Sequence, residues 1–127
     1  MFVPIIPEGA SKPIAPYVHG SLCGDTLYVA GTLPLDRDGG VVHQGDVAAQ
    51  TRHVLDQIQA VVRKAGGTLQ DIAYNMIFIA RAEDYAAMNQ VYGEYFPNPP
   101  ARFCIVSELV KKGCLVEIGS IAHVGRS

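Results

Sequence analysis

The chain has 127 residues, the length of one domain, and carries a net charge of −2 with a pI near 6.0. Hydrophobic residues make up 49% and charged residues only 17%, so we expect such a small domain to cover apolar surface by associating with copies of itself. The acidic balance argues against nucleic-acid binding, and no apolar stretch approaches the ~20 residues of a membrane span.

The cysteines and histidines do not follow the spacing of a metal site. Cys23, Cys104 and Cys114 are odd in number and far apart, which predicts neither a disulfide framework nor a zinc site. No phosphate-binding glycine loop or dinucleotide fingerprint occurs, so no cofactor is expected. Because the start of the chain lacks the pattern of a secretory signal, we expect a reducing, cytoplasmic location.

The first third of the chain is turn-rich and extended. Residues 27–30 predict a strand, bounded by a Gly-Asp turn signal and by Gly31. A second turn at 38–40 precedes two valines at 41–42 that fit the start of another short strand. Asp46 then has the character of a helix N-cap.

Two helices and three further strands are predicted after that cap. Apolar residues recur at helical spacing over 47–65, and two glycines follow. Residues 72–80 are apolar at both parities, as in a strand that is covered on both faces. A second helix is expected to start at Glu83 or Asp84 and to stop before Pro97. Strands are predicted over 102–106 and 115–124.

This order of elements is typical of an α+β fold in which two helices pack on one face of a mixed sheet. We expect residues 1–127 to form a single domain. The opposite face of the sheet also needs a cover, and packing against other subunits would supply it.

Arg102 and Glu117 are the chemical oddities, because both lie inside otherwise apolar strand segments. Alternation places Arg102 and Cys104 on one face of their strand. A register with Cys104 opposite Glu117 would gather all three on one surface, although the sequence leaves other registers open.

Two interpretations of the pair compete. In the first, Arg102 and Glu117 form a structural ion pair within the sheet or across a subunit contact. In the second, they line a pocket, where arginine holds a carboxylate through two parallel hydrogen bonds and glutamate takes a proton from water. Cys104 is by default a small buried hydrophobe, Tyr17 a packing residue, and Asn89 a residue facing solvent.

The residues Pro100-Ala101-Arg102, a cysteine two positions later, and Val116-Glu117-Ile118 resemble the C-terminal signature of the RidA/YjgF family. Residues 31–34 and 50–55 resemble its strand-end turn and its first-helix motif. Within the family, the likeness is greatest to the RutC type, which belongs to pyrimidine utilisation. The segments behind that likeness are 50–55, 66–68, 75–79, 85–89, 100–105 and 121–123.

The resemblance implies a two-layer, chorismate-mutase-like fold with a sheet of about six strands, and a homotrimer with a pocket at each subunit interface. It implies hydrolytic deamination of small enamine or imine acids, without metal or cofactor: 3-aminoacrylate for the RutC type and 2-aminoacrylate for RidA itself. Arg102 would hold the substrate carboxylate and Glu117 would activate water. Tyr17, Cys104 and Asn89 would line the pocket.

One departure concerns Ala30, because many RidA proteins have a serine there that hydrogen-bonds in the pocket. Its absence argues against a preference for 2-aminoacrylate. Two rival functions stay open: reduction of a peroxy-aminoacrylate by a Cys104 thiol, and non-catalytic binding of small carboxylates by a trimer. Cleavage of RNA fits the acidic composition least.

Overall fold

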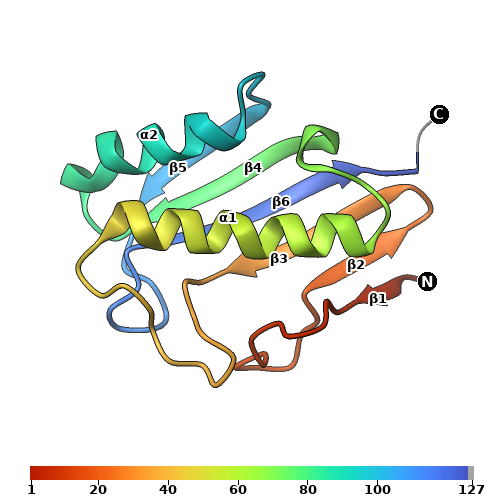
Figure 1. The fold of residues 1–127 in the computed structure, drawn as a ribbon, viewed down its shortest axis with the longest axis horizontal. Helices are drawn as coiled ribbons and strands as arrows, with labels where there is room; N and C mark the ends of the chain where they lie inside the picture. Colours follow the sequence, from red (N-terminus) through yellow and green to blue (C-terminus); the bar gives the residue numbers. More distant parts are fainter. Residues whose placement is uncertain (126–127) are drawn as a thin grey trace.

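A computed structural model describes residues 1–125 as one mixed sheet with two α-helices on one of its faces (Figure 1). The sheet order is β1-β2-β3-β6-β4-β5. The elements are β1 Val3–Ile5, β2 Gly20–Cys23, β3 Thr26–Thr32, α1 Val47–Lys64, β4 Ile72–Ile79, α2 Tyr85–Tyr95, β5 Ala101–Val106 and β6 Val116–His123, with short 3-10 turns at Leu69–Asp71 and Ala82–Asp84. The α+β fold class predicted from the sequence is confirmed.

The last two strands are not neighbours, and the register that placed Cys104 opposite Glu117 is wrong. β4 lies between them, parallel to β5 and antiparallel to β6. Cys104 therefore stands opposite Ile77, and Glu117 stands opposite Phe78. A parallel strand following a helix is the usual outcome of a β-α-β crossover, and here α2 is the crossover between β4 and β5.

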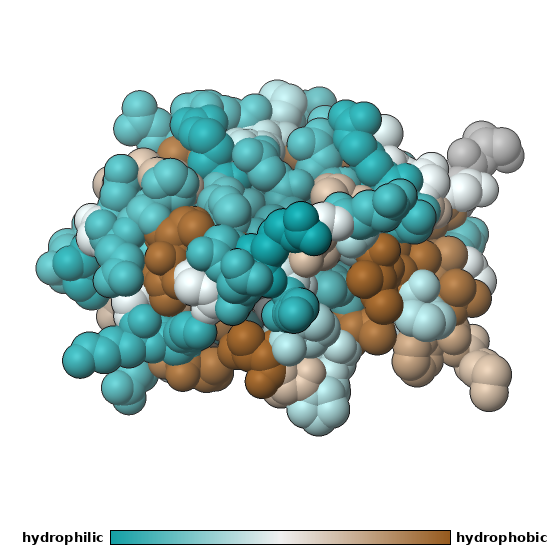
Figure 2. Space-filling view, turned by 60° about the horizontal axis from the view of Figure 1, so that its bottom comes forward, coloured by the Kyte–Doolittle hydropathy of each residue, from teal (hydrophilic) through white to brown (hydrophobic). Residues whose placement is uncertain are grey.

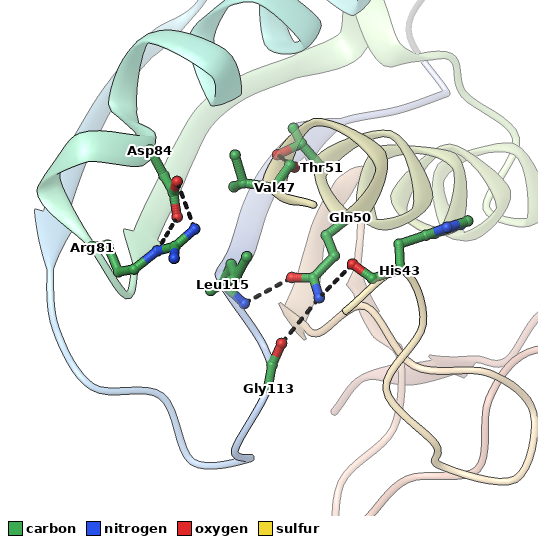
Figure 3. Close-up of polar contacts among 8 residues, drawn as sticks. All are labelled: His43, Val47, Gln50, Thr51, Arg81, Asp84, Gly113 and Leu115. Carbon is green, nitrogen blue, oxygen red and sulfur yellow. Dashed lines mark hydrogen bonds and ion pairs between the residues drawn. The ribbon is translucent and has the colours of Figure 1, made fainter. Parts of the chain in front are cut away.

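The first helix begins and ends where its capping residues predict. The Asp46 carboxylate accepts a hydrogen bond from the Ala49 amide at 3.0 Å, and Gly66 adopts a left-handed φ of 94° just beyond the last turn. The second helix begins at Tyr85, just after the expected start, because Ala82–Asp84 forms a 3-10 turn. The Asp84 carboxylate in this turn forms an ion pair with Arg81 at 2.9 Å (Figure 3). No helix within residues 1–125 combines the length and apolarity that crossing a bilayer requires.

The two faces of the sheet differ in their cover. Both helices lie on the same side (Figure 1), where side chains such as Leu55, Ile77 and Ile118 are fully buried. On the other side, here called the open face, Tyr28 and Ile105 are 48% and 47% exposed. Figure 2 shows apolar residues gathered along the lower edge of the molecule in that view. An apolar sheet face of this kind fits burial against another protein surface.

Gln50 ties α1 to the loop that leads into β6, although its own side chain is fully buried. Its amide nitrogen donates to the Gly113 carbonyl at 3.0 Å, and its amide oxygen accepts from the Leu115 N–H at 2.7 Å (Figure 3). These bonds satisfy backbone groups that would otherwise be buried without partners. They hold the backbone at Leu115, directly before β6 and two residues before Glu117.

Candidate functional site

Arg102 lies on the edge strand β5, and its guanidinium is held by side chains of α2. One terminal nitrogen, Nη2, donates to the Asn89 amide oxygen at 2.7 Å and to the Tyr85 hydroxyl at 3.2 Å. The guanidinium carbon lies 4.7 Å from the centre of the Tyr92 ring. A guanidinium carries five N–H donors, so this arrangement leaves most of its fork available to a ligand.

Glu117 lies on β6, on the open face of the sheet. Its carboxylate packs against Gly31 at the end of β3, where any larger side chain would clash with it. Burial raises the pKa of Glu117 above its usual value. A carboxylate with a raised pKa is a stronger base, which is the property needed to take a proton from water.

Tyr17 and Ala30 border a hollow on the same side as Glu117. The hollow has a volume of about 570 Å³, and its other lining residues are Phe2, Pro16, Val18, Ser21, Tyr28 and Val29. Tyr17 also lines a small neighbouring cavity together with Gly31, the residue that contacts the glutamate. The structure thus brings Tyr17 and Glu117 into the same neighbourhood.

Within one chain, however, Arg102 and Glu117 point to opposite faces of the sheet. Arg102 stands opposite Asn75, which is fully buried beneath α2. Glu117 stands opposite Phe78, which is three residues beyond Asn75 on β4. Because side chains alternate along a strand, Phe78 and Glu117 face the other side of the sheet. The expectation that alternation and register would bring the two onto one surface of a single chain is wrong, because β4 separates their strands and the parities differ.

Cys104 lies on the same side as Arg102, one pleat further along β5, and is partly buried. Burial raises the pKa of its thiol, and the nearby Arg102 only partly opposes that effect. A protonated thiol is a poor nucleophile and a poor reductant. The environment of Cys104 therefore favours a wall residue over a reactive one.

Two residues of the arginine site were missed from the sequence. From the sequence, no site role is expected for Tyr85 or Tyr92, whereas the family resemblance places Asn89 in the pocket. All three share one face of α2, because they are spaced by four and three residues. The available signal was an asparagine that lies between two tyrosines on that face.

Another hollow, of about 390 Å³, lies between α1 and the segment 7–11, and none of the predicted site residues lines it. It is lined in part by His19 and His53. Across residues 1–125, no three His, Cys, Asp or Glu side chains come together as the ligands of a metal ion would.

The chain is similar in sequence and structure to proteins of one known family. Residues 8–124 match the family model described as Endoribonuclease L-PSP. The structure of YyfA from Yersinia pestis, a Rid-family protein of unknown function, is 35% identical, with a TM-score of 0.90 over 98% of this chain and 100% of that one.

Two proteins of E. coli are similarly related. The YjgF gene product is 33% identical, with a TM-score of 0.87 over 98% of this chain and 99% of that one. TdcF, solved with bound serine, is 32% identical, with a TM-score of 0.84 over 96% and 98%. These matches place the chain in the YjgF/RidA family, whose family model is described as Endoribonuclease L-PSP.

Proposed function

We propose that this protein is a hydrolytic deaminase of small enamine or imine acids, and that its preferred substrate is 3-aminoacrylate, which it converts to malonic semialdehyde and ammonia in pyrimidine breakdown. The observation that carries the proposal is the guanidinium of Arg102, held from behind by Asn89 and Tyr92 with most of its donors free. Such a fork binds a planar carboxylate through two parallel hydrogen bonds.

Glu117 supplies the base in this scheme. The enamine first tautomerises to an imine, whose carbon is electrophilic. Glu117 takes a proton from water as the water oxygen attacks that carbon, and the resulting carbinolamine expels ammonia after a proton returns to nitrogen. The C–N bond is replaced by a C=O bond, so water is the only co-reactant and no electron acceptor is required.

Because the two groups face opposite sides of the sheet, the pocket needs two copies of the chain. One copy would contribute Arg102 and Cys104 from the edge strand β5. Its neighbour would contribute Glu117, Tyr17 and Ala30 from the open face. The exposed apolar side chains of the open face support such packing, and a homotrimer in which each interface holds one pocket fits the family.

The wall formed by Ala30 bears on the choice of substrate. Alanine offers no hydroxyl to the pocket, and Phe2, Val18 and Tyr28 make the surrounding hollow largely apolar. Recognition then depends on the carboxylate at Arg102 and on the position of the imine carbon relative to Glu117. A 3-imino acid places that carbon one bond further from the carboxylate than a 2-imino acid. The relative rates of the two isomers therefore report how far the base lies from the carboxylate anchor.

The direct test is release of ammonia from freshly generated 2- and 3-aminoacrylate, measured against the spontaneous rate of each. We expect acceleration of both, with the larger kcat/KM for 3-aminoacrylate. A larger value for 2-aminoacrylate would replace the proposed substrate and keep the reaction class. No acceleration of either would refute the deaminase.

A non-catalytic binder of small carboxylates is the second candidate, and a relative was solved with bound serine. Arg102 and the side chains of Tyr85, Asn89 and Tyr92 that surround its guanidinium, here called the arginine seat, suffice for binding. Glu117→Gln separates the two candidates. It abolishes turnover in a deaminase, whereas a binder retains its only activity. Cleavage of RNA, which the family description names, is disfavoured by the net charge of −2.

A further inference from the structure

A chain of buried polar groups runs behind the arginine seat. The Ser120 hydroxyl of β6 donates to the amide oxygen of Asn75 on β4 at 2.5 Å. The Asn75 amide nitrogen donates in turn to the Tyr92 hydroxyl of α2 at 2.9 Å. Ser120 and Asn75 are fully buried and Tyr92 is 4% exposed, so these three hydrogen-bonded side chains lie within an otherwise apolar core.

The register of the sheet places the chain in line with Arg102. Ser120 stands opposite Asn75, and Asn75 stands opposite Arg102, so the three residues form a row across β6, β4 and β5 on the side of the helices. Tyr92 lies over this row, with its hydroxyl bonded to Asn75 and its ring 4.7 Å from the guanidinium carbon. Among the side-chain hydrogen bonds and ring contacts of residues 1–125, the tyrosine is thus the only link between the buried groups and the guanidinium.

Burying three polar groups costs free energy that apolar side chains would not cost, and hydrogen bonds between them return only part of it. What a fully satisfied network adds is rigidity and a single arrangement. Here, the group that is made rigid is the aromatic ring that forms the floor of the arginine seat. A cation on a fixed ring face has a fixed position and tilt.

We propose that Ser120, Asn75 and the Tyr92 hydroxyl are positioning residues that hold the Tyr92 ring in place and thereby fix the orientation of the Arg102 guanidinium. The proposal deepens the proposed function, since it rests on Arg102 as the carboxylate anchor. The positioning itself is a property of the protein without substrate. Asn89 restrains one edge of the guanidinium, and the Tyr92 ring restrains its plane.

The test uses two variants, Tyr92→Phe and Ser120→Ala, which each remove one hydroxyl from one end of this hydrogen-bonded series. Thr51→Val is the matched control, because its hydroxyl is also fully buried but donates to the Val47 carbonyl of α1, away from the seat. The primary measurement is the rotation rate of the Arg102 guanidinium about its Nε–Cζ bond, by NMR of the full-length protein, with the signal assigned through Arg102→Ala.

We expect rotation to be slow in the wild type and in Thr51→Val, and several-fold faster in Tyr92→Phe and Ser120→Ala. Binding of pyruvate, a simple carboxylate probe, should weaken about tenfold in the same two variants, as expected for a misoriented anchor. With aminoacrylate, KM should rise while kcat stays near the wild-type value.

A purely structural role predicts a different pattern: a lower melting temperature in all three variants, with unchanged rotation and unchanged pyruvate affinity. That result would overturn the proposal. If the wild type fails to turn over aminoacrylate, the proposed function is refuted, and the rotation rates still decide whether the buried chain positions Arg102.

Discussion

Arg102 and Glu117 project from opposite faces of one sheet, and strand β4 lies between their two strands. The arginine lies under α2, whereas the glutamate lies beside Gly31 on the open face. Neither group has the other as a partner within the chain, so the structural ion pair within one sheet is not formed. In the proposed deaminase, each face carries one element of the site, and two copies of the chain would complete it.

Replacing Arg102 with alanine should remove binding of carboxylate substrates. We expect kcat/KM to fall by about a hundredfold or more, because the variant loses the charge-assisted hydrogen bonds between the guanidinium and the substrate carboxylate. Arg52→Ala is the control, since Arg52 pairs with Glu94 on the exposed surface and lies outside the site. Ammonia-release kinetics of both variants provide the measurement, and equal rates would remove Arg102 from the mechanism.

Glu117→Gln should lose turnover but gain stability at neutral pH. Burial raises the pKa of Glu117 in the folded chain. Its contribution to stability is therefore present below the unfolded pKa and is lost as pH rises through the folded pKa. Above that point the buried charge is a cost, which glutamine avoids.

Melting temperatures of the wild type and Glu117→Gln as a function of pH test this sign. The curves should converge in acid and separate towards neutral pH, with the variant higher. The separation should widen in an Arg102→Ala background, because a neighbouring guanidinium would lower the pKa of the carboxyl. A variant that is less stable than the wild type at neutral pH would contradict the assignment of cause.

Cys104→Ala should retain most of the activity. The thiol pKa is raised by burial, so little thiolate exists near neutral pH. For the same reason iodoacetamide should modify the exposed Cys23 before Cys104. Mass spectrometry of partially alkylated protein gives the order, and an inactive Cys104→Ala enzyme would restore the thiol mechanism.

Gly31→Ala should disable the enzyme without unfolding it. A methyl group there would collide with the Glu117 carboxylate and displace it, for which we expect at least a tenfold loss of kcat. Gly93→Ala is the matched control: the added methyl meets no neighbour, and α2 should gain about 1 kcal/mol from the better helix former. Normal kcat in Gly31→Ala would separate the glycine from the site.

Local signals predicted the helices and the main strands well. The Asp46 cap and the Gly66 end bound α1 as expected, and the apolar run predicted as a strand over 72–80 forms strand β4, Ile72–Ile79. The edge strand β1 and its neighbour β2 were not predicted, because Val3–Ile5 contains a proline and Gly20–Cys23 begins with glycine. Such strands form through pairing with a neighbour and not through their own propensity.

The sequence singles out Arg102 and Glu117 as candidate site residues, but it does not predict how they are arranged in the fold. Sequence neighbours along the chain suggested that β5 and β6 form a hairpin, whereas β6 inserts between β3 and β4. Which strands pair depends on long-range packing, which no local pattern encodes. The same holds for Asn89: its helix face is readable, but its partner Arg102 becomes evident only when α2 crosses over β5.

Mixing two inactive variants tests the two-copy site most directly. Arg102→Ala and Glu117→Gln, co-expressed with different tags and purified through both, form assemblies in which some interfaces combine an intact arginine with an intact glutamate. We predict that activity returns to about a third of the wild-type level, because each mixed trimer has one interface of three that combines both intact groups. A mixed assembly as inactive as each parent would contradict a pocket built from two chains.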